Sequence, residues 1–170
     1  MCLMTAPITE PWLSGEHQDV DPVLRPILFS LEQAKQDLRH WTTGISDTEV
    51  WARPHGLAPI GFQLRHIAGS VDRLYSYCRS EKLTELQMEF MRAEMEPGAG
   101  LGELLKDIET TFDRVVAAVK SMPISAIRDH RSVGRKQLPT TVIGLLIHIA
   151  EHTQRHVGQA IVTARVLKSA

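Results

Sequence analysis

The chain has 170 residues and a mass of 19.0 kDa, which is the size of one domain and excludes a multi-domain assembly. Its 19 Lys and Arg residues balance 20 Asp and Glu residues, so a formal charge of −1 leaves no basic excess for holding a nucleic acid. Hydrophobic residues make up 43% and charged residues 23%, which excludes a disordered chain and indicates a folded, soluble protein.

Three features favour a cytoplasmic protein with no membrane partner. Residues 1–20 lack the basic and apolar regions of a secretion signal. The longest apolar run, residues 142–147 with Gly144 inside it, is far shorter than the roughly 20 residues of a membrane span. Cys2 and Cys78 are too few for a disulfide framework, which favours a reducing compartment.

The first part of the chain predicts a leader, a long helix and a short turn. Residues 1–20 show no periodicity, so this leader is poorly structured, either disordered or held to the surface by Trp12 and Leu13. An Asp-Pro pair is typical of a helix start and opens a helical pattern over residues 21–41. Residues 46–49 then form a capping box that begins a short turn.

The rest of the chain predicts three more long helices and one short one. Proline begins a second long helix over residues 59–80, and a Thr–Gln capping box opens a short helix over residues 84–94. Residues 101–119 form the third long helix. Residues 124–138 are polar without a clear period, so they cross over the bundle or pair locally as an extended piece. The last helix begins at the Pro-Thr-Thr of residues 139–141 and ends near Leu167.

Four long helices of similar length predict a mainly α fold, a four-helix bundle over residues 21–170 with short extra helices and a crossover loop. Such bundles build their sites from side chains that face inward on neighbouring helices. Eight histidines are an unusual number for a chain of this size, and histidine is the commonest metal ligand. The composition therefore directs attention to the inward-facing histidines.

The last predicted helix carries three histidines at four-residue intervals, His148, His152 and His156. Residues four apart are turned by about 40° and rise about 6 Å, so neighbouring members can bind one ion. His148 and His156 start about 12 Å apart, too far for a shared ion with bonds of about 2.0–2.1 Å. On a helical wheel His152 and His156 face the core and His148 stands at its margin. We predict His152 and His156 as ligands and His148 as a residue beside the site.

Two histidines are rarely a complete site, because catalytic zinc sites use three protein ligands and keep one position open. His66 lies in the middle of the second long helix, on a polar flank like the one that bears His148 and His152. We predict His66 as the third ligand. The candidates for binding substrate are the polar residues of these two flanks, Gln63, Ser70, Tyr77, His148, Arg155 and Gln159.

Plainer interpretations of the same residues stay open. Two histidines four apart can also be a hydrogen-bonded polar pair in the core, and three imidazoles suit Zn, Ni, Cu and Fe alike. No Glu follows the first histidine, which excludes the zincin arrangement with its general-base glutamate. We expect structural roles for His17, His40, His55 and His130, and the role of a buried hydrophobe for Cys78.

Two segments of the chain resemble the DinB/YfiT-like superfamily of metal-dependent enzymes. They are residues 60–67, IGFQLRHI, and residues 148–159, HIAEHTQRHVGQ, which ends in His-x3-His-x-Gly-Gln. The resemblance extends over about residues 21–168. It implies a four-helix bundle, a divalent metal such as zinc or nickel held by His66, His152 and His156, and frequently a homodimer. Arg155 stands where many members have a second histidine.

The resemblance also implies a range of activities on small-molecule substrates. Characterised relatives include S-transferases that use a low-molecular-weight thiol such as bacillithiol, thiol-dependent isomerases and proposed hydrolases. In each, the metal would lower the pKa of a bound thiol or water and present the anion as nucleophile. Two alternatives remain: a non-catalytic metal-binding or stress-response module, and a metal-free dimerising domain that binds a small ligand between helices.

Overall fold

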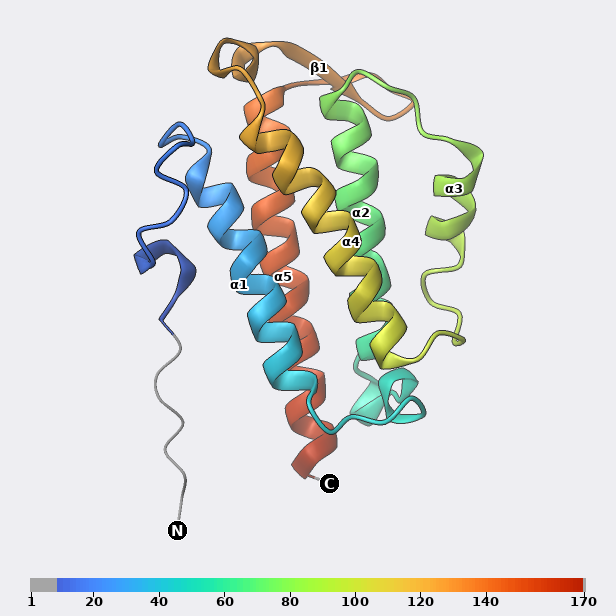
Figure 1. The fold of residues 1–170 in the computed structure, drawn as a ribbon. Coiled ribbons are helices and arrows are strands. Elements are labelled where there is room, and N and C mark those ends of the chain that lie inside the picture. The colour runs from blue at the N-terminus through green and yellow to red at the C-terminus, as the bar shows by residue number, and fades with distance from the viewer. Residues whose placement is uncertain (1–8, 170) are drawn as a thin grey trace.

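Four long helices form a bundle in the computed structural model, which describes residues 9–169 (Figure 1). They are α1 (Arg25–Thr42), α2 (Ile60–Cys78), α4 (Leu101–Lys120) and α5 (Val142–Ser169). α5 packs against α1 and α2, and α4 packs against the same two helices, so α1 and α2 are diagonal partners. In Figure 1, α1 and α5 run downward while α2 and α4 run upward.

Both connections between diagonal helices are long crossovers. The first, residues 43–59, contains two single 3-10 turns, Glu49–Trp51 and Pro54–Gly56. The second, residues 121–141, contains the 3-10 helix Ile124–Arg128 and an antiparallel hairpin. In this hairpin β1 (His130–Val133) pairs with β2 (Leu138–Thr141), so that His130 lies opposite Thr141 and Val133 opposite Leu138.

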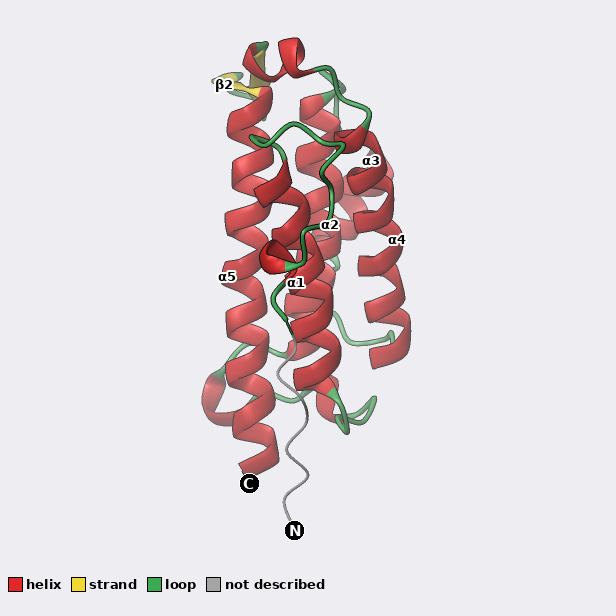
Figure 2. Ribbon diagram, turned by 60° about the vertical axis from the view of Figure 1, so that its left-hand side comes forward, coloured by secondary structure: helices red, strands yellow, loops and turns green. Residues whose placement is uncertain are grey.

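A fifth helix, α3 (Glu85–Arg92), lies outside the bundle and packs on α2 (Figures 1 and 2). It begins at Thr84, whose hydroxyl accepts a hydrogen bond from the Gln87 amide N–H while the Gln87 side chain accepts one from the Thr84 N–H. This is the predicted capping box. None of the residues of α3 itself is buried, and the Gln87 side chain holds the helix to α2 by donating to Asp72 and Ser76.

Apolar side chains at helical spacing fill the space between α1, α2, α4 and α5. Removing such side chains from water stabilises the fold by roughly 1.5–3 kcal/mol each. The largest of the fully buried ones include Leu28, Leu31, Ile60, Leu64, Phe112 and Ile149. The apolar stripes therefore orient the helices. Burying these stripes places the neighbouring polar flanks of α2 and α5 at the seam between the two helices. Among the described residues, no helix is long and apolar enough to cross a membrane.

The bundle and most element positions confirm the sequence predictions, but the start of the first helix was wrong. α1 begins at Arg25 with a proline in its first turn, which is Pro26 and not Pro22. Asp21 instead caps a preceding turn, since its carboxylate accepts a hydrogen bond from the Val23 N–H at 2.9 Å. The Asp-Pro signal therefore marks a turn that leads into the helix.

The start of the last helix was also misplaced, because residues 139–141 belong to β2 and α5 begins at Val142. The open alternative for residues 124–138 resolves to a short 3-10 helix followed by an extended strand. A helix start and a strand end look alike in a Pro-Thr-Thr sequence, because both the N-cap residue and a strand residue have extended backbone.

Trp12 and Leu13, the expected anchors of the N-terminal segment, are 60% and 59% exposed. Pro11 and Val20 are buried in their place. The His17 ring also contacts the Glu32 carboxylate of α1 at 2.6 Å. The part of the leader within residues 1–8, including Cys2, lies outside the described residues.

Candidate metal centre

The rings of His66, His152 and His156 come together at the seam between α2 and α5. Ring centroids are 4.3 Å apart for His66 and His156, 4.5 Å for His152 and His156, and 5.1 Å for His66 and His152. One ring nitrogen of each lies within 4.8 Å of those of the other two. The two helices are antiparallel neighbours, which is why histidines far apart in the chain meet here.

Glu94, from the loop after α3, fixes the ring of His66. Its carboxylate Oε2 lies 2.7 Å from His66 Nδ1. A carboxylate only accepts hydrogen bonds, so Nδ1 of His66 carries a proton that it donates to Glu94. Nε2 of His66 faces Nε2 of His152 at 2.9 Å. Burial would raise the pKa of Glu94, but the hydrogen bond from His66 and the charge of Arg73 lower it below its ordinary value.

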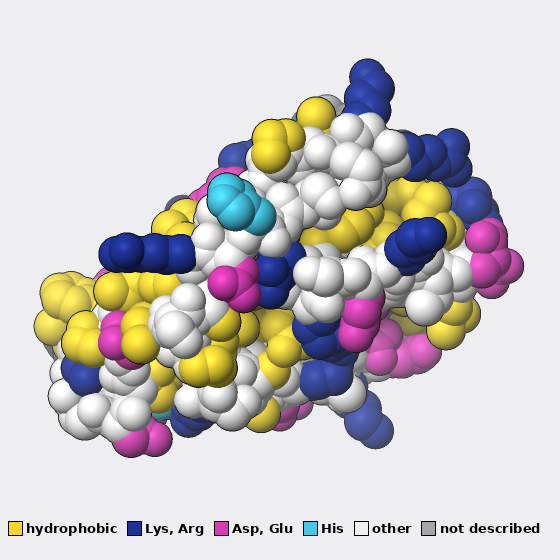
Figure 3. All heavy atoms as spheres, turned by 90° about the horizontal axis from the view of Figure 1, so that it is seen from above, with side chains coloured by type: hydrophobic (Ala, Val, Ile, Leu, Met, Phe, Trp, Pro, Cys, Tyr) yellow, Lys and Arg dark blue, Asp and Glu magenta, His cyan; other side chains and the backbone are white. Residues whose placement is uncertain are grey.

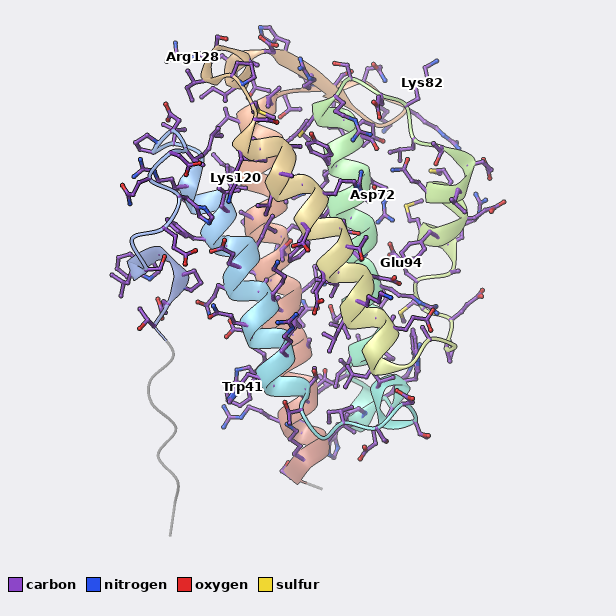
Figure 4. The ribbon with its side chains drawn as sticks, in the orientation of Figure 1. Trp41, Asp72, Lys82, Glu94, Lys120 and Arg128 are labelled. Atoms are coloured by element: carbon purple, nitrogen blue, oxygen red, sulfur yellow. The ribbon has the colours of Figure 1, made fainter. Side chains whose placement is uncertain are left out.

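Arg73 completes a buried chain of groups from α2 to α3. Its Nη2 lies 2.8 Å from Oε1 of Glu94, and the side chains of both residues are less than a tenth exposed. Gly69, one turn earlier on α2, leaves the room they need. A Cβ at residue 69 would lie 2.7 Å from Arg73 Nη1 and 3.0 Å from Glu94 Oε1. Figure 4 shows Glu94 on the α3 side of the bundle.

Gln63 orients the ring of His156 as Glu94 orients the ring of His66. The buried Gln63 side chain accepts a hydrogen bond through Oε1 from His156 Nδ1 at 2.6 Å. The proton is again on Nδ1, which leaves Nε2 free. Two of the three rings therefore donate through Nδ1 to an acceptor within the protein, which turns their Nε2 atoms toward the centre of the cluster.

The environment favours the neutral form of His152 and His156. Burial, followed by the neighbouring His66 and His152, lowers the pKa of His156 to about 4. Burial and then the nearby His66 also lower the pKa of His152. Its buried Nδ1 has no hydrogen-bond partner among the described residues. The 2.9 Å contact between Nε2 of His66 and Nε2 of His152 is a hydrogen bond, so one of these two nitrogens carries a proton, which a shared cation would displace.

The residues fit a divalent metal ion. The 2.9 Å between Nε2 of His66 and Nε2 of His152 is shorter than two metal–nitrogen bonds of about 2.0–2.1 Å, so one ion can reach both. A carboxylate or amide on the far nitrogen of a ligand histidine is the usual support of such a site. Three histidines also leave a position open, as catalytic sites do.

Three of the predicted substrate-binding residues line one cavity of about 350 Å³ beside the histidines. These are Gln63, Arg155 and Gln159, and the cavity continues along α5 to Val162. None of the three histidines lines this cavity, and Gln63 links it to the cluster through its contact with His156 Nδ1. Arg155 is exposed and is held by the Glu151 carboxylate at 2.6 Å.

The structure places the other three candidates elsewhere. Ser70 is buried and its hydroxyl donates to the carbonyl of Ile67 at 3.1 Å. Tyr77 lines a separate cavity at the far end of α2. His148 stands at the margin, as the wheel predicts: its ring centroid is 5.2 Å from that of His152, and its Nδ1 contacts Glu151 at 2.6 Å.

Sequence reasoning missed Glu94 and Arg73. Glu94 lies just past α3 in a run of acidic and flexible residues, where an exposed role is the ordinary expectation. Arg73 stands seven residues after His66, on the same flank of α2, which is the one local signal for it. Which carboxylate meets it depends on how α3 folds back, and no local pattern encodes that.

The fold and the cluster define a helical-bundle protein with a candidate three-histidine metal centre. The family model of the DinB superfamily matches residues 30–160, so the chain belongs to the DinB superfamily. A conserved protein from Enterococcus faecalis, known from its crystal structure, has the same fold with a TM-score of 0.72. It is 14% identical, and the match covers 87% of this chain and 98% of that one. A comparison with curated proteins finds no match.

Proposed function

We propose that the protein is a metal-dependent enzyme, an S-transferase or hydrolase, whose divalent metal is held by His66, His152 and His156. Zinc and nickel are the ions we propose, since both bind imidazole well. The observation that carries the proposal is the pair of hydrogen bonds from His66 to Glu94 and from His156 to Gln63. These hydrogen bonds turn the Nε2 atoms of both rings toward one point between α2 and α5. A seam that was only polar would not require this orientation.

When bound, a divalent ion lowers the pKa of a coordinated thiol or water and so supplies a nucleophile at neutral pH. The chain's own residues prepare the place for it. Glu94 and Gln63 hold the Nδ1 protons of their rings, and burial favours the neutral form of His152 and His156. Nε2 of His156 is thereby free to bind an ion, and the proton shared between Nε2 of His66 and Nε2 of His152 would be displaced as the ion binds.

The adjoining cavity supplies the substrate side of the proposal. Its volume of about 350 Å³ suits a small molecule, for which a low-molecular-weight thiol and its electrophile are our proposal. The Gln159 amide and the Arg155 guanidinium offer hydrogen-bond donors to polar or anionic groups of that substrate. Gln63 connects the two parts, because it lines the cavity and orients His156.

The first test is metal content. Protein purified without a nickel column and loaded with zinc or nickel should contain about one ion per chain by elemental analysis. His152→Ala should lose the ion, because two rings remain of three. His148→Ala is the matched control and should keep it, since that ring is exposed. A folded wild-type protein that takes up no ion would contradict the proposal.

The second test separates catalysis from a structural role. We would screen the loaded enzyme with several small thiols paired with electrophiles, and with simple esters and amides. Turnover found for the wild type should disappear in His152→Ala and persist in His40→Ala, which changes an exposed histidine of α1. If His152→Ala lost the metal and melted at a lower temperature while turnover persisted, the metal would have a structural role. The protein would then be a non-catalytic metal-binding module.

A further inference from the structure

A second cavity, of about 880 Å³, lies between α3 and the β1–β2 hairpin at the end of the bundle where α2 stops. Its entrance is visible in Figure 3, where hydrophobic side chains line a hollow and Lys and Arg side chains stand around it. The only candidate residue of the sequence analysis that lines it is Tyr77. Tyr77 follows His66 by eleven residues, about 16 Å along a helix, so this cavity is separate from the metal centre.

The floor of the cavity is apolar and adaptable. Leu83, Met88 and Met91 line it together with the half-buried ring of Tyr77. Met91 is 39% exposed, so part of its side chain is open to solvent. Unbranched methionines adjust to ligands of different shape, and they are common at binding surfaces that accept several apolar groups.

The rim is cationic, and two of its charges have no partner. Lys82 and Arg135 line the cavity and form no ion pair with any residue from 9 to 169. Figure 4 shows Lys82 between the hairpin and α3. The carboxylate on this rim, Glu81, is taken by Arg79, whose Nε donates to it at 2.8 Å. The free charge at the entrance is therefore positive.

The wall facing these groups is preformed. Arg131 of β1 donates from Nε to the carbonyl of Cys78 at 2.6 Å, which fastens the hairpin to the end of α2. Ser80 follows α2 with a left-handed φ of 61°, and Gln137 in the hairpin has a φ of 48°. Both residues line the cavity. Non-glycine residues adopt this strained backbone where the surrounding structure enforces it, and such residues concentrate at ligand sites.

We propose that this cavity binds a small organic anion with an apolar body, such as a medium-chain carboxylate. The apolar part would lie against Leu83, Met88 and Met91, and the carboxylate would pair with Lys82 and Arg135. The volume lies within the range of small-molecule sites, roughly 300–1,000 Å³. The proposal is independent of the metal centre, because none of the cavity's lining residues touches the three histidines.

The test uses octanoate as probe and protein labelled with carbon-13 at the methionine methyl groups. Titration should shift the methyl resonances of Met88 and Met91 and leave that of Met122 unchanged, since Met122 packs in the core and does not line the cavity. Octylammonium, which has the same tail and the opposite charge, should shift neither. Equal responses to both probes, or no response to octanoate, would overturn the proposal.

The double variant Lys82→Glu with Arg135→Glu should weaken octanoate binding by about tenfold or more. Its matched control is Lys120→Glu with Arg128→Glu, which makes the same charge change at exposed residues on the same end of the bundle (Figure 4). Octanoate bound at the metal centre would persist in the first variant, and that result would overturn the proposal. The proposal would also be overturned if the protein bound phosphatidylglycerol vesicles but did not respond to octanoate. That result would mean that this face binds a membrane surface.

Discussion

At His66, one imidazole ring meets an acid on one side and two further imidazoles on the other. Glu94→Gln removes the negative charge that orients the His66 ring, and the glutamine side chain has almost the same size as the glutamate side chain. We expect the dissociation constant for zinc or nickel to rise about 10- to 100-fold, the usual effect of losing such a supporting contact. Competition with a chromophoric chelator measures it.

Glu96→Gln is the matched control for that prediction, because Glu96 is exposed and its hydrogen bonds to described residues use its backbone: its carbonyl accepts from Arg65 and its N–H donates to Ala93. Its metal affinity should equal that of the wild type. Equal affinities for Glu94→Gln and Glu96→Gln would mean that the carboxylate of Glu94 does not support the site.

The lowered pKa values of His152 and His156 predict how the metal-free protein responds to acid. A histidine whose pKa is lower in the folded state binds fewer protons than the unfolded chain does. Its contribution to stability is therefore complete above about pH 6.5 and is lost progressively as the pH falls toward about 4. Urea unfolding of metal-free protein at several pH values should show the free energy of unfolding falling over this window.

His156→Gln should flatten that pH dependence, because the group that must stay unprotonated is gone. His148→Gln should keep the wild-type slope, since its ring is exposed and lies outside the cluster. Identical slopes for the wild type and His156→Gln would show that His156 titrates in the folded protein as it does in the unfolded chain.

The sequence predicts the three histidines but not the residues that hold them. His152 and His156 are readable because helical spacing alone decides which side of α5 faces the core. The Glu94–Arg73 pair joins α2 to the loop after α3, and a contact between separate elements leaves no periodic trace. Ser70 and Tyr77 share the flank of His66 in the sequence, but the packing of α3 and the hairpin gives each a different environment.

At the scale of the element, α3 can approach α2 only because residue 69 is a glycine. Gly69→Ala would place a Cβ 2.7 Å from Arg73 Nη1 and 2.9 Å from Phe90 Cε1 of α3. We expect it to lower the free energy of unfolding by about 1–3 kcal/mol, the usual range for overpacking, although alanine is the better helix former. Urea denaturation measures the change.

Gly102→Ala is the control for helix propensity. Gly102 also lies inside a helix, α4, but a Cβ there meets nothing within 4 Å. Because Gly102 lies in the first turn of α4, this substitution should raise the free energy of unfolding by at most about 0.5 kcal/mol, less than at a position in the middle of a helix. If both Gly69→Ala and Gly102→Ala stabilised the protein, the conclusion that α3 packs closely on Gly69 would be wrong.

Elements with local signals were predicted well, and elements that need a distant partner were not. The capping boxes at residues 46–49 and at Thr84 are formed by neighbours in sequence, and both are present. The hairpin requires β1 to pair with β2, and because its strands are short and polar the sequence left a crossover and a local extended pair as alternatives. The four long helices were recognisable because their apolar stripes extend over many turns.

For the whole molecule, a bound metal would join α2 to α5 across the bundle. An ion that binds only the folded state stabilises it by about 2.7 kcal/mol at a hundred times its dissociation constant. For a chain of this size that corresponds to a melting temperature raised by roughly 5–10 °C. Calorimetry with and without a chelator measures the shift. His66→Ala should show no shift, and a chelator-insensitive wild type would contradict the proposed centre.

The chain of contacts from His66 through Glu94 also links the cluster to a helix that buries none of its own residues. Weakly packed segments exchange their amide protons through local opening, at a rate set by the few contacts that hold them. Hydrogen–deuterium exchange over residues 85–96 should therefore slow when the ion binds, since a fixed His66 ring holds its acidic partner in place. A peripheral helix would thus report, from outside the bundle, whether the interior is loaded.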